Sequence, residues 1–557
     1  MKDKLTLKWL YANSKGQLWR IVLLSVMRCS LTILGVTFAL VSRYVIDAAV
    51  AHNISGLTKS ALVLLLLIAS QIGIRLLGQS LEVVICARLN MKIRGKLFAS
   101  ILKCDYSAQA KYHSGDLLTR LSNDTSIVAS GIISLIPSVL ALIVGLTYAL
   151  IALTRLDKNF AIILLAGGIL LLLAISAFRG IMKKLHKRVQ ETEARVRSFF
   201  QESMGSLLMV KVFGIEDAIS QKGDLLQNEN YKAQMKRRNL SIFASSSLAF
   251  LFSISSLYAL TYSAYRLYLG TITFGTLTAI LQLVNQIQSP FAGLSGVMPQ
   301  YYAILASAER IIEIESLPEE DNNREKLNPE TSYQNLTEIN FTDISFSYGR
   351  DIVLENANLT IEKGDFAVIS GISGIGKSTL IKLLLGVISP KEGSITLKIN
   401  GQDMPCGKYS RPLFSYVPQG NLLLSGTIRE AVSMVADNAT DEEIMAAAEI
   451  SCCADFIQKL PQGLGTYIGE KGFGLSEGQI QRLAVCRAIL SGAPIILLDE
   501  ATSALDEETE ATLLQNIRNM KGKTCIIISH KRAASEICNK HIFIENKKIK
   551  TTKNHSS

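Results

Sequence analysis

The stretch Gly371-Ile372-Ser373-Gly374-Ile375-Gly376-Lys377-Ser378-Thr379 decides the fold of the second half of this chain. The apolar run Phe366 to Ile369 before it predicts a buried strand, and Leu380 to Leu385 after it predict a helix. A strand, a glycine-rich loop and a helix form the setting in which a polyphosphate binds. Glycines let backbone N–H groups come close to phosphate oxygens, and the helix N-terminus adds the positive end of its dipole. The sequence therefore predicts a nucleotide-binding loop, whose phosphate contacts come from Gly371, Ser373, Gly374, Gly376 and Thr379.

Two side chains of this loop suggest charge and metal chemistry. Lys377 supplies a positive charge for the outer phosphates, and Ser378 offers its hydroxyl to Mg²⁺. Downstream, the apolar run Pro494 to Leu498 predicts a buried strand that ends in Asp499 and Glu500. Asp499 suits a contact with Mg²⁺, and Glu500 suits a general base that polarises the attacking water.

A third apolar run, Thr524 to Ile528, predicts another strand and ends at Ser529 and His530. A neutral imidazole at that position is able to hydrogen-bond a γ-phosphate. A histidine alone in such a place is more often structural, so both interpretations stay open on the residues themselves.

Length and composition bound the answer further. The chain has 557 residues, too many for one hydrophobic core, and 48% of them are apolar. Its net charge of +11 fits basic loops beside an anionic membrane leaflet, and no aromatic and basic pattern indicates nucleic acid. Nine scattered cysteines without CxxC spacing indicate free thiols in a reducing compartment and argue against a zinc site.

The first half of the chain predicts a membrane domain. Its first 20 residues are basic, contain Trp9 and Trp19, and suit an interfacial helix at the cytoplasmic side. Six apolar stretches follow, each long enough for the roughly 20 residues that a helix needs to cross a bilayer. They run approximately over 21–48, 57–85, 128–153, 160–178, 240–269 and 274–294.

The loops between these stretches predict the orientation of the chain. The loops after the second and fourth spans are long, helical and rich in lysine and arginine, whereas the others are short. By the positive-inside rule the long loops and both termini are cytoplasmic. The sequence thus predicts a multi-pass protein of the cytoplasmic membrane.

Polar side chains inside the spans have two interpretations. They include Arg28 in the first span, Gln71, Arg75, Gln79 and Glu82 in the second, and Gln282, Asn285, Gln286 and Ser289 in the sixth. Such residues either hydrogen-bond neighbouring helices or line a polar substrate pathway. Both interpretations stay open, and the charged residues favour a cavity.

These observations predict the domain organisation. Residues 1–316 form a six-helix α transmembrane domain, and 317–335, which are charged and rich in proline and asparagine, form a linker. Residues 336–557 form an α/β P-loop NTPase domain.

The soluble domain resembles the nucleotide-binding domain of an ABC transporter, over essentially all of 335–545. Five motifs beyond the phosphate loop and the Asp499-Glu500 strand carry the resemblance. They are the adenine-stacking aromatic Tyr348, the metal-sensing loop Val417-Pro418-Gln419, the signature Leu475-Ser476-Glu477-Gly478-Gln479, the dimer-contacting loop Ser503-Ala504-Leu505-Asp506 and the switch histidine His530.

The resemblance implies ATP and Mg²⁺ as ligands, with Gln419 contacting the metal and the catalytic water. It also implies that Ser476, Gly478 and Gln479 contact the ATP held by another subunit, beside the loop that ends at Asp506. The active unit would then be a dimer. Since every catalytic position is present, a homodimer would have two competent sites, and a heterodimer with another half-transporter is the alternative. Glu477 departs from the family pattern, which has glycine there.

The membrane half resembles that of exporter-type half-transporters. Ser114 to Asp124 and Met209 to Glu216 resemble the two coupling helices, and Thr466 to Glu470 resemble a loop typical of exporters. The resemblance implies ATP-driven export of a peptide or an amphipathic or hydrophobic small molecule by alternating access. The alternatives are a lipid flippase, an importer on the same fold, and an ATP-gated channel or sensor.

Overall fold

The computed structural model describes two compact units. One unit comprises Met1–Ala99 and Ser114–Glu315, and the other comprises Ser100–His113 and Ser316–Ser557. The residues described are 2–320, 325–420, 423–436, 438–469, 472, 474–520 and 522–553. Among these, only the course of the backbone is described for 2–3, 159, 164–179, 183, 289–296, 298 and 553. Glu470, part of the loop that resembles that of exporters, lies outside the described residues.

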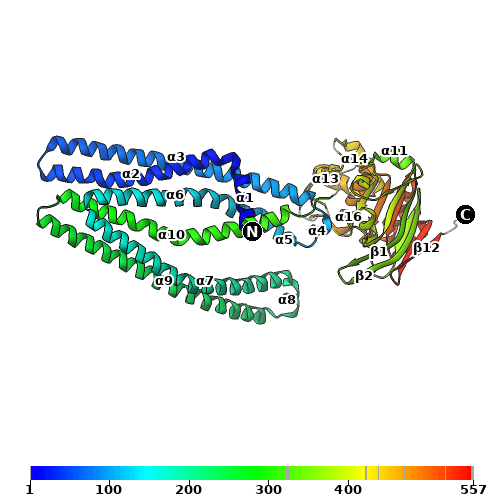
Figure 1. Cartoon of the computed structure of the whole chain (residues 1–557). Helices are drawn as coiled ribbons and strands as arrows, with labels where there is room; N and C mark the ends of the chain where they lie inside the picture. Colours follow the sequence, from blue (N-terminus) through cyan, green and yellow to red (C-terminus); the bar gives the residue numbers. More distant parts are fainter. Residues whose placement is uncertain are drawn as a thin grey trace. The chain divides into compact units, whose positions relative to one another are not determined.

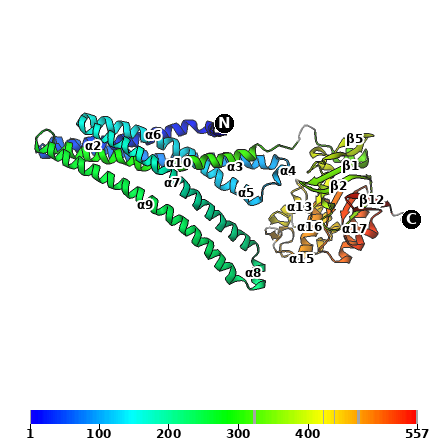
Figure 2. The same cartoon turned by 60° about the horizontal axis from the view of Figure 1, so that its bottom comes forward.

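The first unit is helical. After α1 (Lys2–Ser14), its long helices are α2 (Leu18–Val50), α3 (Ile54–Lys103), α6 (Thr125–Leu156), α7 (Lys158–Gly205), α9 (Glu216–Tyr268) and α10 (Phe274–Glu315). Helices α2, α3, α6 and α10 run side by side, whereas α7 and α9 leave them as a long hairpin with α8 (Leu207–Phe213) at its tip (Figures 1 and 2).

Each predicted span lies on one of these long helices. Within the described residues, four stretches are long and apolar enough to cross a membrane: Lys4–Val50, Ile54–Lys103, Ser114–Leu156 and Glu216–Tyr268. The predicted spans 160–178 and 274–294 lie on α7 and α10, in helices whose side chains are described only in part. A helical membrane domain is therefore confirmed, and the count of six spans stays a prediction.

The two segments that resemble coupling helices are short helices between long ones. The first is α5 (Ser114–Thr119), followed by a π-helical turn at Arg120–Asp124, and the second is α8. The buried Asp124 carboxylate accepts hydrogen bonds from Ser307, at 3.0 Å, and from the Arg310 guanidinium, at 2.8 Å from Nε. These contacts tie the first of the two segments to α10.

The segment predicted as a linker, 317–335, has local structure on both sides of 321–324, which lie outside the described residues. Near its start, Asp105, in the short segment between α3 and α4 (Tyr106–Gln109), donates its backbone N–H to Pro318 O at 2.8 Å. Glu320 accepts two hydrogen bonds from Arg411, at 2.9 and 3.0 Å. Near its end, helix α11 (Pro329–Gln334) buries Tyr333.

The second unit contains two main sheets (Figure 1). The larger has six strands in the order β12-β11-β3-β10-β9-β6, and the smaller is an antiparallel sheet in the order β2-β1-β4-β5. Strands β11, β3, β10, β9 and β6 pair in parallel, and β12 is antiparallel. The large-sheet strands are β3 (Phe366–Ser370), β6 (Phe414–Val417), β9 (Ile495–Asp499), β10 (Thr524–Ile528), β11 (Lys540–Glu545) and β12 (Lys548–Lys553).

The remaining elements surround this sheet. The smaller sheet consists of β1 (Leu336–Tyr348), β2 (Asp351–Glu362), β4 (Glu392–Ile399) and β5 (Gln402–Pro405), and β7 (Gly426–Thr427) pairs with β8 (Tyr467–Ile468). The helices are α12 (Lys377–Leu384), α13 (Ile428–Ser433), α14 (Asp441–Ile450), α15 (Ala454–Lys459), α16 (Glu477–Leu490), α17 (Glu507–Asn519) and α18 (Arg532–Ile537).

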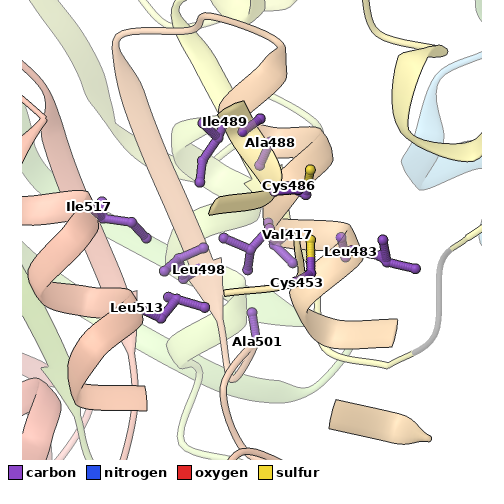
Figure 3. Close-up of a cluster of buried hydrophobic side chains, with 14 of the residues drawn as sticks. Val417, Cys453, Leu483, Cys486, Ala488, Ile489, Leu498, Ala501, Leu513 and Ile517 are labelled. Carbon is purple, nitrogen blue, oxygen red and sulfur yellow. The ribbon is translucent and has the colours of Figure 1, made fainter. Parts of the chain in front are cut away.

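The apolar runs of the sequence are the central strands, buried on both faces. Because successive side chains of a strand point to opposite faces, Leu498 packs in one core cluster and Leu497 in the other. Figure 3 shows the first cluster, in which Val417 and Leu498 of the sheet lie near Leu483 and Ile489 of α16. Burial on both faces explains why these strands are continuously apolar rather than alternating.

Gly393, in β4, provides a prediction about stability. Its φ is +84°, and a Cβ there would overlap the carbonyl oxygens of Thr342 and Asp343 in β1. Gly401 has a similar φ of +74°, but a Cβ there meets open space. We expect Gly401→Ala to lower the free energy of unfolding by about 1 kcal/mol, because alanine disfavours the left-handed backbone conformation. Gly393→Ala should lower the free energy of unfolding by about 1–3 kcal/mol more than that. Its new methyl group overlaps backbone oxygens, which cannot rotate away as a side chain can.

The measurement is the thermal unfolding midpoint of the two purified full-length variants in detergent without nucleotide. Gly393→Ala should unfold clearly below Gly401→Ala. Equal midpoints would show that the β1–β4 contact relaxes at no cost.

Candidate functional site

The glycine-rich loop connects β3 to α12, as its sequence predicts. Gly371, Gly374 and Gly376 have φ of +154°, +81° and +113°, a region that side chains with a Cβ rarely adopt. A Cβ on Gly376 would also overlap Val353 of β2, so the loop lies against the smaller sheet. The loop therefore needs glycine for its conformation and for its close packing.

Lys377 is buried at the first position of α12, with 5% of its surface exposed. Its ammonium donates to the carbonyl oxygens of Gly371, at 2.8 Å, and Ile372, at 3.4 Å. It also lies 2.6 Å from Nε2 of His530. The structure thus brings the lysine and the histidine, predicted from separate motifs, to the same loop.

The parallel sheet explains how residues far apart in sequence meet. Strands β3, β6, β9 and β10 point the same way, so their carboxyl ends share one edge of the sheet. The glycine-rich loop follows β3, Gln419 follows β6, Asp499 ends β9, and His530 follows β10. This shared edge is where an open α/β sheet binds its ligand.

Asp499 is held by two hydroxyl groups. Its Oδ1 accepts from Ser378 Oγ at 3.0 Å, and its Oδ2 accepts from the Tyr416 hydroxyl at 3.1 Å. Only 2% of Asp499 is exposed, and this burial raises the pKa of its carboxyl, while both hydrogen bonds oppose the rise. Burial also raises the pKa of Tyr416, so its hydroxyl stays protonated and donates.

Glu500 lies directly after β9 with a φ of +50°, a left-handed conformation for a residue with a side chain. Its Oε2 accepts a hydrogen bond from Gln419 Nε2 at 2.6 Å. Strained backbone of this kind often occurs at functional sites. The structure therefore pairs the predicted base with the predicted metal-sensing glutamine.

Tyr348 ends β1, where 48% of its surface is exposed. Its ring packs edge-on against Phe346, with centroids 4.9 Å apart. The neighbouring strand β2 carries Val353, against which the glycine-rich loop packs. Tyr348 pairs with Asp351 at the same end of β2, so its exposed ring suits stacking on the flat base of a nucleotide.

The signature residues lie at the N-terminus of α16. Ser476 Oγ accepts from the Gln479 N–H at 3.3 Å, and Gln479 Oε1 accepts from the Ser476 N–H at 2.9 Å. This capping box fixes the start of the helix. Gly478 lies against Ala504 of the predicted dimer-contacting loop, since a Cβ there would meet Ala504 O at 3.1 Å.

The predicted dimer-contacting loop ends in a helix cap. Asp506 Oδ2 accepts from the Thr509 N–H at 2.9 Å at the start of α17, and this hydrogen bonding lowers the pKa of Asp506. The hydrogen bonds of the signature residues and of Asp506 described above are local. None of these three hydrogen bonds joins the signature residues or Asp506 to the Lys377–His530 pair or to Asp499.

Three groups of residues at or near the site were not predicted. Tyr416 holds Asp499, and Gln481 of α16 bonds Ser503 Oγ and the Ala504 N–H, both at 3.0 Å. The buried Glu510 accepts from Thr502 at 2.7 Å and pairs with Lys531 at 3.3 Å. No spacing in the sequence singled them out, because their roles depend on contacts between elements.

The site fits Mg²⁺. Ser378 Oγ and Asp499 Oδ1 are two possible oxygen ligands, 3.0 Å apart. Ser378 lies at the start of α12, beside the loop predicted to bind phosphate. Mg²⁺ prefers oxygen ligands and usually takes one or two from protein, with phosphates and water completing its shell. Gln419, paired with Glu500, is the third residue predicted to contact the metal.

Seven of the polar residues of the predicted spans fall into two groups. Arg28 bonds Glu82 at 2.7 Å and Ser138 at 2.6 Å, each on a different helix. Gln282 accepts from Ser42 at 3.2 Å, and Gln286 donates to Gly35 O at 2.7 Å. These residues make interhelical hydrogen bonds. Three others, Arg75, Gln79 and Asn285, are exposed in the single chain and stay candidates for a polar cavity.

Two sequence families match this chain. Residues 21–291 match the family described as the ABC transporter transmembrane region, and residues 354–503 match the family described as ABC transporter. Together the two matches cover most of the chain, in the order predicted from the sequence.

Relatives and a solved structure agree with this assignment. A probable ABC transporter ATP-binding/permease protein of Haemophilus influenzae is 28% identical, over 87% of each chain. An ATP-dependent lipid A-core flippase of Desulfotalea psychrophila is 29% identical, over 82% of this chain and 80% of that protein. In fold, the chain is similar to a bacterial Atm1-family ABC exporter with ATP bound, with a TM-score of 0.80 and 24% identity over 97% of this chain and 95% of that one. The chain belongs to the ABC transporter superfamily and is an integral membrane protein that has the fold of an ABC exporter and a fused ATP-hydrolysing domain.

Proposed function

We propose that this chain is a half-transporter that works as a homodimer and uses ATP hydrolysis to export a peptide or an amphipathic or hydrophobic small molecule. One observation carries the catalytic part of the proposal. Three pairs of functional groups, Lys377–His530, Ser378–Asp499 and Gln419–Glu500, form at one edge of the sheet, at 2.6, 3.0 and 2.6 Å.

Each pair has a role in hydrolysis. Lys377 and the loop amides bind the phosphates, and His530 hydrogen-bonds the γ-phosphate. Ser378 and Asp499 would hold Mg²⁺, which neutralises phosphate charge when bound. Glu500 accepts the proton of the attacking water, and Gln419 orients that carboxylate through the 2.6 Å hydrogen bond.

The proposed dimer follows from the signature. The N-terminus of α16, capped by Ser476 and Gln479, offers backbone donors and the positive end of a helix dipole. In the proposed dimer these groups contact the ATP of the other subunit, next to the loop that ends at Asp506. A homodimer completes two such sites, whereas a heterodimer would need a second chain.

The location follows from the charge distribution. The basic loops and the soluble domain lie in the cytoplasm with both termini, and the long helices cross the cytoplasmic membrane. The exposed polar residues Arg75, Gln79 and Asn285 suit a cavity for a substrate with both polar and apolar parts.

A lipid flippase is the second candidate. The flippase of Desulfotalea psychrophila is among the chain's relatives, and a lipid also combines a polar head with apolar chains. An importer and an ATP-gated channel are the remaining alternatives, and Glu500 favours a hydrolytic cycle over gating.

The test is the ATPase rate of the purified single chain in nanodiscs, alone and with peptides, hydrophobic drugs or lipids added. We expect hydrolysis by the single chain and stimulation by one ligand class, which names the substrate class. Stimulation by lipid alone would favour the flippase. ATP binding without any hydrolysis would contradict the homodimeric pump. Transport into inverted vesicles distinguishes export from import.

A further inference from the structure

Tyr416 reaches the metal-binding carboxylate because of the sheet register. It pairs with Leu497 across the parallel strands β6 and β9. Leu497 and Asp499 are two residues apart, so their side chains lie on the same face of the sheet, and Tyr416 packs in the same core cluster as Leu497. Two residues along a strand cover about 6.6 Å, a distance that a phenol ring with its hydroxyl spans.

The hydroxyl completes the hydrogen bonding of a buried group. Asp499 is 2% exposed, and a buried carboxylate needs donors for both of its oxygens. The Ser378 hydroxyl donates to Oδ1 at 3.0 Å, and the Tyr416 hydroxyl donates to Oδ2 at 3.1 Å. With both oxygens held, the carboxylate cannot rotate, and Oδ1 stays beside the Ser378 hydroxyl.

We propose that Tyr416 is a positioning residue for the divalent cation: its hydroxyl holds Oδ2 of Asp499 so that Oδ1 and Ser378 Oγ are presented together to Mg²⁺. The inference rests on the proposed function, because it requires these two oxygens to bind the cation that accompanies ATP. Tyr416 acts through Asp499. Groups that orient a metal ligand in this way typically change metal affinity by about 10- to 100-fold.

The test compares the wild-type chain with Tyr416→Phe, which removes only the hydroxyl, in full-length protein in nanodiscs. Mn²⁺ serves as the probe for Mg²⁺, and its free concentration is measured by electron paramagnetic resonance with protein in excess over ATP. We expect Mn²⁺ affinity to fall by about 10-fold or more. The Mg²⁺ concentration for half-maximal ATPase should rise by a similar factor, and the rate at saturating Mg²⁺ should largely recover. ATP affinity in EDTA should stay within about twofold.

Tyr333→Phe is the matched control. Tyr333 is a buried tyrosine of the second unit, and its hydroxyl forms a hydrogen bond with Thr524 Oγ1 at 2.8 Å. The Tyr333→Phe variant also loses one phenol hydroxyl, but that hydroxyl does not bond Asp499. The Mn²⁺ affinity of this variant should therefore match that of wild type. Replacing Tyr416 with 4-aminophenylalanine, which restores an N–H donor at the same reach, should recover Mn²⁺ affinity.

Three results would overturn the inference. One is equal Mn²⁺ affinity for wild type and Tyr416→Phe, with both binding ATP in EDTA, which leaves the proposed function intact. Another is an equal loss of metal-free ATP binding and of Mn²⁺ binding, because the tyrosine would then be a structural residue. The third is an absence of rescue by 4-aminophenylalanine, which also decides the case if Tyr416→Phe does not fold. Failure of the wild type to hydrolyse ATP would instead reject the proposed function.

Discussion

Glu500→Gln is expected to reduce the ATP turnover of the purified chain by about 10²- to 10⁴-fold while leaving ATP binding intact. The carboxylate lies at the carboxyl edge of the sheet and accepts a hydrogen bond from Gln419 at 2.6 Å. Glutamine has the same shape and is able to keep a contact with Gln419, but its amide cannot take a proton from water. The loss should therefore affect the rate at saturating ATP and not the affinity for ATP.

The measurement is single-turnover ATP hydrolysis in nanodiscs, with ATP affinity measured in parallel. Glu507→Gln, an exposed glutamate in the first turn of α17, is the matched control and should keep wild-type turnover. Residual activity above about a tenth of wild type would be too high for loss of a general base. The base would then be another group.

Lys377→Ala is expected to weaken ATP binding by about 10- to 100-fold, the range for losing a charged hydrogen-bond donor. The ammonium is 5% exposed and bonds two carbonyl oxygens of the loop, at 2.8 and 3.4 Å. It is therefore positioned at the loop before any phosphate arrives. Lys377→Arg should also bind poorly, because a planar guanidinium does not fit a buried site shaped for an ammonium.

Equilibrium binding of a fluorescent ATP analogue measures this effect. The control is Lys398→Ala, which removes a part-exposed lysine that pairs with Glu338 at 3.0 Å in the smaller sheet. It should bind ATP like wild type. Unchanged affinity in Lys377→Ala would mean that the backbone amides alone hold the phosphates.

Much of the fold could be predicted because buried elements have a recognisable pattern of apolar residues in the sequence. The strands β3, β9 and β10 are buried on both faces, so they are continuous apolar runs in the sequence. The glycine-rich loop is recognisable because positive φ at Gly374 and Gly376 requires glycine. Long apolar helices indicate a membrane for a similar reason, because side chains that face lipid must be apolar along the whole span.

The contacts of the site were harder to predict, because they form between strands that are neighbours only in space. The order β3-β10-β9-β6 brings Lys377 to His530 and Gln419 to Glu500, although the members of each pair lie far apart along the chain. Tyr416 is the clearest example. One tyrosine in a short strand carries no pattern, and only the register with Leu497 places it at Asp499.

The sequence by itself determined the order of the domains, the family and the chemistry available at the phosphate loop, because these depend on residue types at short spacing. Only the tertiary structure decided which oxygen of Asp499 faces which hydroxyl and that Arg28 bonds Glu82 between helices. It also showed that the signature residues cap their own helix. The physical reason is that a hydrogen bond requires its partners within about 3 Å, and side chains from separate elements come that close only when the sheet and the helices pack.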